Sequence, residues 1–130
     1  MNKTIFGTGI FFGVTAVILG AFGAHGLEKL IAEDAIRTFE TGVTYQMYHA
    51  LFLLVLANVK PIPAKSKKLV YYFIVVGLVL FSFSIYLLAT NALTEFNFKK
   101  IALLTPLGGT LLILGWVFCG VAVVKTKNWK

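Results

Sequence analysis

Apolar residues along the chain gather into four long runs separated by short polar segments. The runs cover about residues 4–24, 42–59, 69–90 and 101–124, and none of them contains Asp, Glu, Lys or Arg. Each run holds roughly 18–24 residues, enough for a helix to cross the about 30 Å hydrocarbon core of a bilayer. A chain in lipid must satisfy its own backbone hydrogen bonds, and continuous apolarity does not fit the alternation of barrel strands. The pattern predicts an all-α integral membrane protein: a four-transmembrane-helix bundle forming one domain, residues 1–130.

The polar segment between the first two runs, residues 27–40, has a helical periodicity of its own. Its apolar residues share one face, and its charged residues occupy the other. Glu33 also has oppositely charged residues four positions away on both sides, Lys29 and Arg37, a spacing that suits ion pairs on a helix. We expect a short amphipathic helix along the outer membrane interface, with a plain solvated connector as the alternative.

Composition supports the membrane assignment. Hydrophobic residues make up 58% of the 130 residues, against roughly 45–50% in soluble domains, and so small a soluble domain could not bury them. The first run could be mistaken for a cleaved signal peptide, but its apolar part is longer than a usual signal core. The single cysteine, Cys119, excludes an intrachain disulfide, and no Cys/His zinc spacing is present.

The basic residues are distributed unevenly between the two ends of the predicted bundle. The formal net charge is +7, but the lysines flank apolar runs and do not form an aromatic-rich nucleic-acid surface. Four spans place both termini and the middle connector on one side, which carries eight bases and no acids: Lys3, Lys60, Lys65, Lys67, Lys68, Lys125, Lys127 and Lys130. The other side carries all five acids beside four bases: Glu28, Glu33, Asp34, Glu40 and Glu95 with Lys29, Arg37, Lys99 and Lys100. Lysine and arginine mark cytoplasmic loops, so we expect both termini in the cytoplasm of a multi-pass plasma-membrane protein.

Small residues recur inside the runs at helical spacing. In lipid, small residues let helix backbones approach closely, and this contact drives helix association. We expect the glycines to form packing faces, within the bundle or between protomers of a homo-oligomer: Gly9, Gly13, Gly20, Gly23, Gly108, Gly109 and Gly115. A nucleotide-binding loop at residues 7–13 is excluded because no strand precedes it and it would lie inside the membrane.

The pair Thr105-Pro106 near the start of the fourth run has two interpretations. Thr105 can cap the helix with Pro106 at its first position. Alternatively, Pro106 kinks a longer helix that starts near residue 101. Both helices are long enough to span, so the sequence leaves the choice open.

Polar side chains are expected to converge in the outer half of the bundle. Tyr45 and His49 are four residues apart and Gln46 and His49 three apart, so each pair can share a helix face. A histidine embedded in a membrane needs a partner or a wet cavity, and for His49 the candidates are Tyr45, Tyr86, His25 or a backbone carbonyl. The whole predicted cluster is His25, Tyr45, Gln46, Tyr48, His49, Ser82, Ser84, Tyr86 and Thr105.

Three interpretations of this cluster are open. It can be a hydrogen-bonded lock that orients the spans, an outward pocket for a lipid headgroup or another ligand, or a metal, haem or catalytic site. The third is the least supported, because no nucleophile, base and orienting group form a recognisable set. His25 and His49 also differ in depth by helical rise, which disfavours paired haem ligation. We therefore expect no cofactor, no metal and no catalytic residue.

Motifs in all four runs resemble one known family. "GAFGAHGL", "TGVTYQMYHAL", "LFSFSIYLLA" and "TPLGGTLLILGW" are similar to motifs of the bacterial small membrane proteins catalogued as domain of unknown function 423, a family that looks related to a small four-span protein of animals. The resemblance implies a bacterial plasma-membrane protein and supplies no activity or catalytic residue. Phe83 departs from the pattern, since members often carry glycine between the two serines. The matching positions are Gly20, Gly23, His25, Tyr45, Gln46, His49, Ser82, Ser84, Tyr86, Thr105, Pro106, Gly108, Gly109, Gly115 and Trp116.

The sequence thus favours a non-enzymatic structural or accessory membrane protein. We expect membrane lipids as its ligands, a homo-oligomer or a membrane protein partner, and no nucleic acid. A small transporter or channel centred on His49 is the main alternative, because His49 can titrate while the four runs contain no carboxylate. A membrane-embedded enzyme ranks third.

Overall fold

The computed structural model describes residues 2–93 and 101–129, and every described element is helical. In chain order the elements are α1 (Asn2–Phe22), the π-helical turn η1 (Gly23–Leu27), α2 (Glu33–Asn58), α3 (Ala64–Leu78), the π-helical turn η2 (Val79–Phe83), α4 (Ser84–Ala89), the 3₁₀ turn η3 (Asn91–Leu93) and α5 (Leu104–Lys125).

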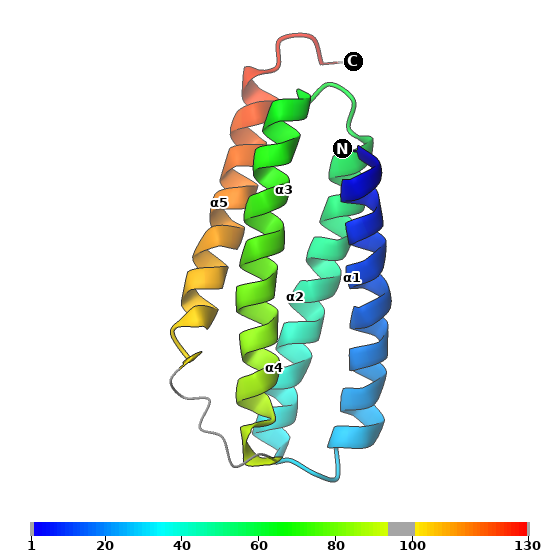
Figure 1. Ribbon diagram of the computed structural model, residues 1–130, viewed down its shortest axis with the longest axis vertical. Helices are drawn as coiled ribbons and strands as arrows, with labels where there is room; N and C mark the ends of the chain where they lie inside the picture. Colours follow the sequence, from blue (N-terminus) through cyan, green and yellow to red (C-terminus); the bar gives the residue numbers. More distant parts are fainter. Residues whose placement is uncertain (1, 94–100, 130) are drawn as a thin grey trace.

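The helices form four antiparallel rods, because α1 runs into η1 and α3, η2 and α4 follow one another without a break (Figure 1). α1 packs mainly on α2, and α5 packs mainly on α3 and η2. α2 joins these two pairs through its contacts with α3, η2 and α4. Both termini and the connector between α2 and α3 lie at one end of the molecule, as the sequence predicts, and the connector between η1 and α2 lies at the other (Figure 1).

Three of the rods are long and apolar enough to cross a membrane: Asn2–Leu27, Ala64–Ala89 and Leu104–Lys125. α2 has 26 residues and matches them in length. Its first turns carry charged residues, however, and its middle carries Gln46 and His49, which lower its mean hydropathy. The described residues therefore show an all-helical protein with three spans that qualify by length and composition.

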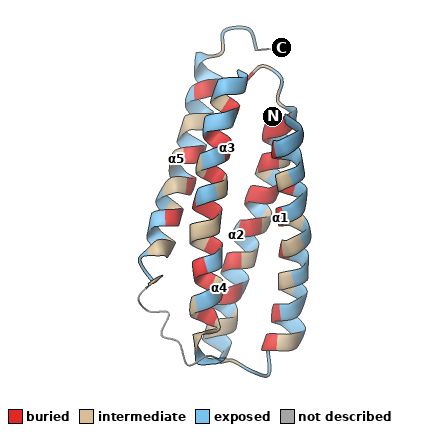
Figure 2. Ribbon diagram, viewed as in Figure 1, coloured by how far each residue is buried: buried red, intermediate tan, exposed pale blue. Residues whose placement is uncertain are grey.

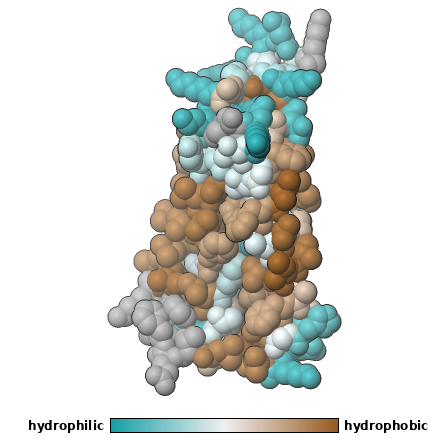
Figure 3. All heavy atoms as spheres, turned by 45° about the vertical axis from the view of Figure 1, so that its right-hand side comes forward, coloured by the Kyte–Doolittle hydropathy of each residue, from teal (hydrophilic) through white to brown (hydrophobic). Residues whose placement is uncertain are grey.

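The surface is apolar over the middle of the molecule and polar at its ends. Figure 3 shows hydrophobic side chains gathered around the middle, with hydrophilic ones above and below. Buried residues concentrate where rods meet, whereas α1 and α5 expose much of their length (Figure 2). Only 22% of the apolar window in the α1 span is buried inside the protein, and the same holds for α5. So much exposed apolar surface suits lipid as the surrounding solvent.

The structure corrects the expectation of a separate amphipathic helix over residues 27–40. Residues 28–32 form a turn, and α2 runs unbroken from Glu33 through the end of this segment to Asn58. Glu33 and Asp34 lie in the first turn, where negative charge stabilises a helix start. The ion pair between Glu33 and Arg37 forms at 3.1 Å, and Phe39 packs with Leu27. The periodicity was therefore real, but it belongs to the beginning of α2.

The start of α5 settles the position of Pro106. The helix begins at Leu104, so Pro106 lies in its first turn and does not interrupt a longer helix. Backbone N–H groups in a first turn have no partner within the helix, so proline costs nothing there. Thr105 does not cap the helix, because its hydroxyl is hydrogen-bonded to Ser84 at 2.6 Å and the residue before the helix, Leu103, makes no side-chain cap.

The closest approach between rods lies where α5 crosses α3 and η2. A Cβ atom built on Gly108 would overlap the backbone nitrogen of Phe81 and lie 2.7 Å from the carbonyl oxygen of Gly77. A Cβ on Gly77 would lie 2.9 Å from the backbone nitrogen of Leu112. The two backbones therefore touch at a pair of glycines, of which the sequence analysis identified only Gly108.

The other six glycines of the predicted packing set fall into two groups. Added Cβ atoms at Gly9, Gly23 and Gly115 would come within 3.0 Å of an atom in a neighbouring element, and one at Gly20 within 3.3 Å. Gly13 and Gly109 leave ordinary van der Waals distances of 3.8 and 3.6 Å. The predicted packing set is therefore mixed: five positions hold close contacts inside the chain and two do not.

One lysine of the basic end is buried. Lys67 is 3% exposed, and its ammonium donates to the side-chain oxygen of Asn2 at 3.3 Å and to the carbonyl oxygen of Ala57 at 3.5 Å. These contacts tie the starts of α1 and α3 to the end of α2. Lys67 therefore packs inside the protein at this end, whereas Lys3, Lys60 and Lys65 are exposed.

Candidate functional site

Gln46, near the middle of α2, is the centre of a hydrogen-bond network between rods. Its side chain is fully buried. Its amide nitrogen donates to the carbonyl oxygen of Phe12 at 2.9 Å and to the hydroxyl of Thr15 at 2.7 Å. Its amide oxygen accepts a hydrogen bond from the hydroxyl of Tyr86 at 2.6 Å. One side chain of α2 therefore links α1 to α4.

His49, one turn further along α2, bonds through both ring nitrogens. The indole nitrogen of Trp116 donates to Nε2 at 3.1 Å. Because Nε2 must then accept, the proton of the neutral ring lies on Nδ1, which donates to the carbonyl oxygen of Tyr45 at 2.7 Å. His49 thus links α2 to α5 in one defined tautomer.

Ser82 and Ser84 connect the third rod to its neighbours on either side. Ser82, in η2, donates to the carbonyl oxygen of Gly42 on α2 at 2.9 Å. Ser84 donates to the carbonyl oxygen of Phe81 at 2.9 Å and is bonded to Thr105 of α5. Gly42 makes the first contact possible, since a Cβ there would lie 2.6 Å from the ring of Tyr86.

The remaining predicted residues lie outside this network. His25 is exposed in η1 and makes no hydrogen bond with a described residue. Tyr45 and Tyr48 present their rings on the outer face of α2, where they are 41% and 58% exposed. Phe83, the departure from the family pattern, is also exposed and does not enter the contact between rods.

Two members of the network were missed as site residues by sequence reasoning. Trp116 stood only among the positions of the resemblance, and Thr15 was not among the predicted site residues. Both lie on rods that pack beside α2, and a partner on another helix is not visible in the spacing within one helix. A backbone carbonyl was one of the candidate partners of His49, and the contact with the carbonyl oxygen of Tyr45 confirms it. The second partner, Trp116, was not among the candidates.

A groove opens beside His49 on the outer surface, between α2 and α5 and over η2. It has a volume of about 300 Å³ and is lined by Tyr45, His49, Phe81, Gly109, Leu112, Ile113 and Trp116. The rings of Tyr45 and Phe81 meet at one wall with centroids 5.1 Å apart. At the other wall, the ring of Trp116 packs at a tilt against that of Phe52, with centroids 4.4 Å apart. The groove is therefore mainly aromatic and aliphatic and opens where lipid would surround the protein.

The arrangement links helices through hydrogen bonds between polar side chains. Among the described residues, every buried side-chain nitrogen or oxygen has a hydrogen-bond partner. No cluster of three His, Cys, Asp or Glu residues that could hold a metal ion occurs in that part of the chain. The hydroxyls nearest the histidine have no base to activate them, because His49 already uses both nitrogens.

Comparison with known proteins yields one family of bacterial membrane proteins. The family model described as "Protein of unknown function (DUF423)" matches residues 19–109. The chain is 40% identical to the UPF0382 membrane protein YwdK of Bacillus subtilis, over 90% of this chain and 93% of that protein. It is 36% identical to a UPF0382 membrane protein of Staphylococcus aureus over 90% and 92% of the two chains.

A third relative comes from Haemophilus influenzae. This UPF0382 membrane protein is 35% identical over 89% of this chain and 90% of its own length. No solved structure matches the chain. The three relatives are all named membrane proteins, and the matches cover about 90% of each chain. Their names state no activity.

Proposed function

The chain belongs to the DUF423 family of membrane proteins, and we propose that it is a non-enzymatic protein of the bacterial plasma membrane that holds a lipid chain in the groove beside His49. All four rods cross the bilayer in this proposal, and both termini face the cytoplasm. The charged start of α2 then lies at the outer interface, and the groove opens to lipid near the middle of the bundle.

Two observations support four crossings. α2 is as long as the qualifying spans and lies antiparallel between α1 and α3 (Figure 1). Its polar residues Gln46 and His49 are buried and hydrogen-bonded to other rods, so they need no water at membrane depth. Lysines gather at the end with the termini, and this distribution supports a cytoplasmic position for that end.

The observation that carries the lipid proposal is the contrast between the network and the groove. Within the described residues, every buried side-chain polar atom is already hydrogen-bonded inside the protein. The opening beside them is lined by Phe81, Leu112 and Ile113 and by the aromatic walls. Such a surface excludes water and favours an apolar chain over a charged substrate.

A homo-oligomer or a membrane protein partner remains part of this proposal. The glycines with close contacts inside the chain are not available for contacts between protomers. An oligomer would therefore use other helix faces. Gly7 on α1 and Gly120 on α5 have open space beside them. Both lie on rods with large exposed apolar surfaces.

Filling the groove tests the proposal without disturbing the network. In Ile113→Trp, an exposed groove residue is enlarged, and we expect about tenfold less lipid retained by the purified protein, equivalent to roughly 1.4 kcal/mol. Val117→Trp is the matched control, since Val117 is exposed on α5 but does not line the groove. Native mass spectrometry measures the retained lipid.

Equal retention by the two variants would count against the groove as a lipid site. The same preparations, reconstituted into liposomes, address the transporter or channel centred on His49. A proton or solute flux that is abolished by His49→Gln, at a pH between about 5 and 8, would replace the present proposal with that alternative.

A further inference from the structure

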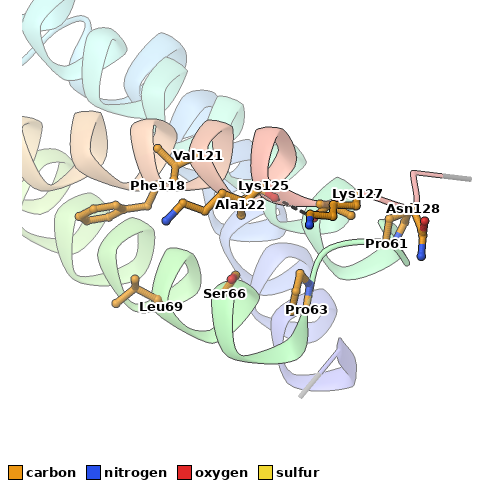
Figure 4. A pocket seen from close by; sticks show the side chains of 11 residues that line it. Pro61, Pro63, Ser66, Leu69, Phe118, Val121, Ala122, Lys125, Lys127 and Asn128 are labelled. Carbon is orange, nitrogen blue, oxygen red and sulfur yellow. Dashed lines mark hydrogen bonds between the residues drawn. The ribbon is translucent and has the colours of Figure 1, made fainter.

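A second and larger groove lies at the end that holds both termini, between the start of α3 and the end of α5. Its volume is about 740 Å³. Ser66 and Leu69 of α3 face Phe118 and Lys125 of α5 across it (Figure 4). The remaining lining residues come from α5 itself, from the connector before α3 and from the segment after α5: Val121 and Ala122, Pro61 and Pro63, and Thr126, Lys127 and Asn128.

The groove changes character along its length. Toward the middle of the molecule it is lined by Leu69, Phe118 and Val121, and these positions belong to the two apolar spans. Toward the end of the molecule it is lined by Lys125 and Lys127, with Ser66 and Asn128 as neutral hydrogen-bonding groups. An occupant that fits both parts has an anionic head and an apolar tail.

The charge at the polar end is not compensated within the described part of the chain. No acidic residue lines the groove, and the ion pair found among the described residues, between Glu33 and Arg37, lies near the opposite end. Lys3, Lys60, Lys65 and Lys68 add positive charge at the same end. The potential here therefore favours an anion over a cation or a zwitterion.

We propose that this groove binds an anionic phospholipid, with the phosphate at the end lined by Lys125 and Lys127 and an acyl chain against Leu69, Phe118 and Val121. A phosphate accepts charge-assisted hydrogen bonds from lysine ammonium groups. The apolar side chains of Leu69, Phe118 and Val121 can pack against an acyl chain, which a free phosphate ion lacks. The proposed occupant is therefore a lipid. This site shares no lining residue with the His49 groove, so it stands or fails independently of that proposal.

The experiment compares lipid binding by the full chain in two kinds of membrane. The protein is placed in nanodiscs of phosphatidylcholine alone or of phosphatidylcholine with phosphatidylglycerol, and native mass spectrometry counts the phosphatidylglycerol that stays bound. The groove variant is Lys125→Gln with Lys127→Gln. The matched control is Lys3→Gln with Lys60→Gln, which removes the same charge from exposed positions at the same end that do not line the groove.

We expect the groove variant to lose its preference for phosphatidylglycerol about tenfold or more, while the control keeps most of it. Equal losses in the two variants would show a diffuse charge effect and overturn the site, as would retention by both. Glycerol phosphate is added as a soluble competitor. If it displaces the lipid at matched concentration, the acyl chain contributes nothing and the assignment to a phospholipid is wrong.

Discussion

Gly108→Ala is expected to destabilise the protein by about 3 kcal/mol, at the upper end of the usual cost of overpacking. The added methyl group would overlap the backbone nitrogen of Phe81 and meet the carbonyl oxygen of Gly77. Backbone atoms of a helix cannot rotate away as a side chain can, so α5 would have to shift from α3 and η2. The measurement is the midpoint of unfolding in mixed detergent micelles.

Gly120→Ala on the same helix provides the control. No atom lies within 4 Å of a Cβ at that position, so the substitution adds only the higher helix propensity of alanine, about 0.5–1 kcal/mol in favour of the helix. Because both variants gain this propensity, their difference reports the contact between α5 and the third rod. If the two variants unfold alike, the two backbones do not touch at Gly108.

Gln46→Leu is expected to cost about 2 kcal/mol. The substitution removes hydrogen bonds to Thr15 and Phe12 and leaves the hydroxyl of the half-buried Tyr86 without this acceptor. An unsatisfied buried group costs about 1–3 kcal/mol, whereas single bonds between membrane helices average only about 0.6 kcal/mol. The expected cost of Gln46→Leu exceeds the value for a single bond because the side chain is hydrogen-bonded to two neighbouring rods, α1 and α4.

A double-mutant cycle isolates the bond between Gln46 and Tyr86. Gln46→Leu and Tyr86→Phe are combined, and the coupling free energy should be about 1 kcal/mol. Tyr48→Phe is the control on the same helix, because Tyr48 is exposed, and a surface change of this kind stays within about 0.5 kcal/mol. Additive effects of the two network substitutions would mean that the bond does not form in the membrane.

Hydrophobic runs were sufficient to predict the helices, because in lipid each helix satisfies its own backbone and its length must match the bilayer. The residues at which the helices begin and end were harder to predict from the sequence. The charged residues 33–40 were assigned to a separate helix, yet nothing between Phe39 and Gly42 stops α2. Part of the charge count rests on Glu95, Lys99 and Lys100, which lie outside the described residues.

Spacing along one helix identified Gln46 and His49 as inward polar residues but could not supply their partners. Ser82 and Ser84 are two residues apart and so point to different neighbours, α2 and α5. Trp116 and Thr15 joined the network because α5 and α1 pack beside α2, which is a property of the assembled bundle. His25 lies where the first apolar run ends, and its side chain has no hydrogen-bond partner among the described residues. The motif "GAFGAHGL" is therefore explained better by the close contacts at Gly20 and Gly23 than by the histidine.

The central claim is that α2 crosses the membrane and carries its polar network into the outer half. Cysteine labelling tests it most directly, with Ala32→Cys before α2 and Ala64→Cys after it, each in a Cys119→Ser background. Both positions are exposed. With a membrane-impermeant maleimide on spheroplasts, we predict that Ala32→Cys reacts at once and Ala64→Cys only after permeabilisation. Equal reactivity would show that α2 does not cross, and the reverse pattern would place the network in the cytoplasmic half, so either result would contradict the account.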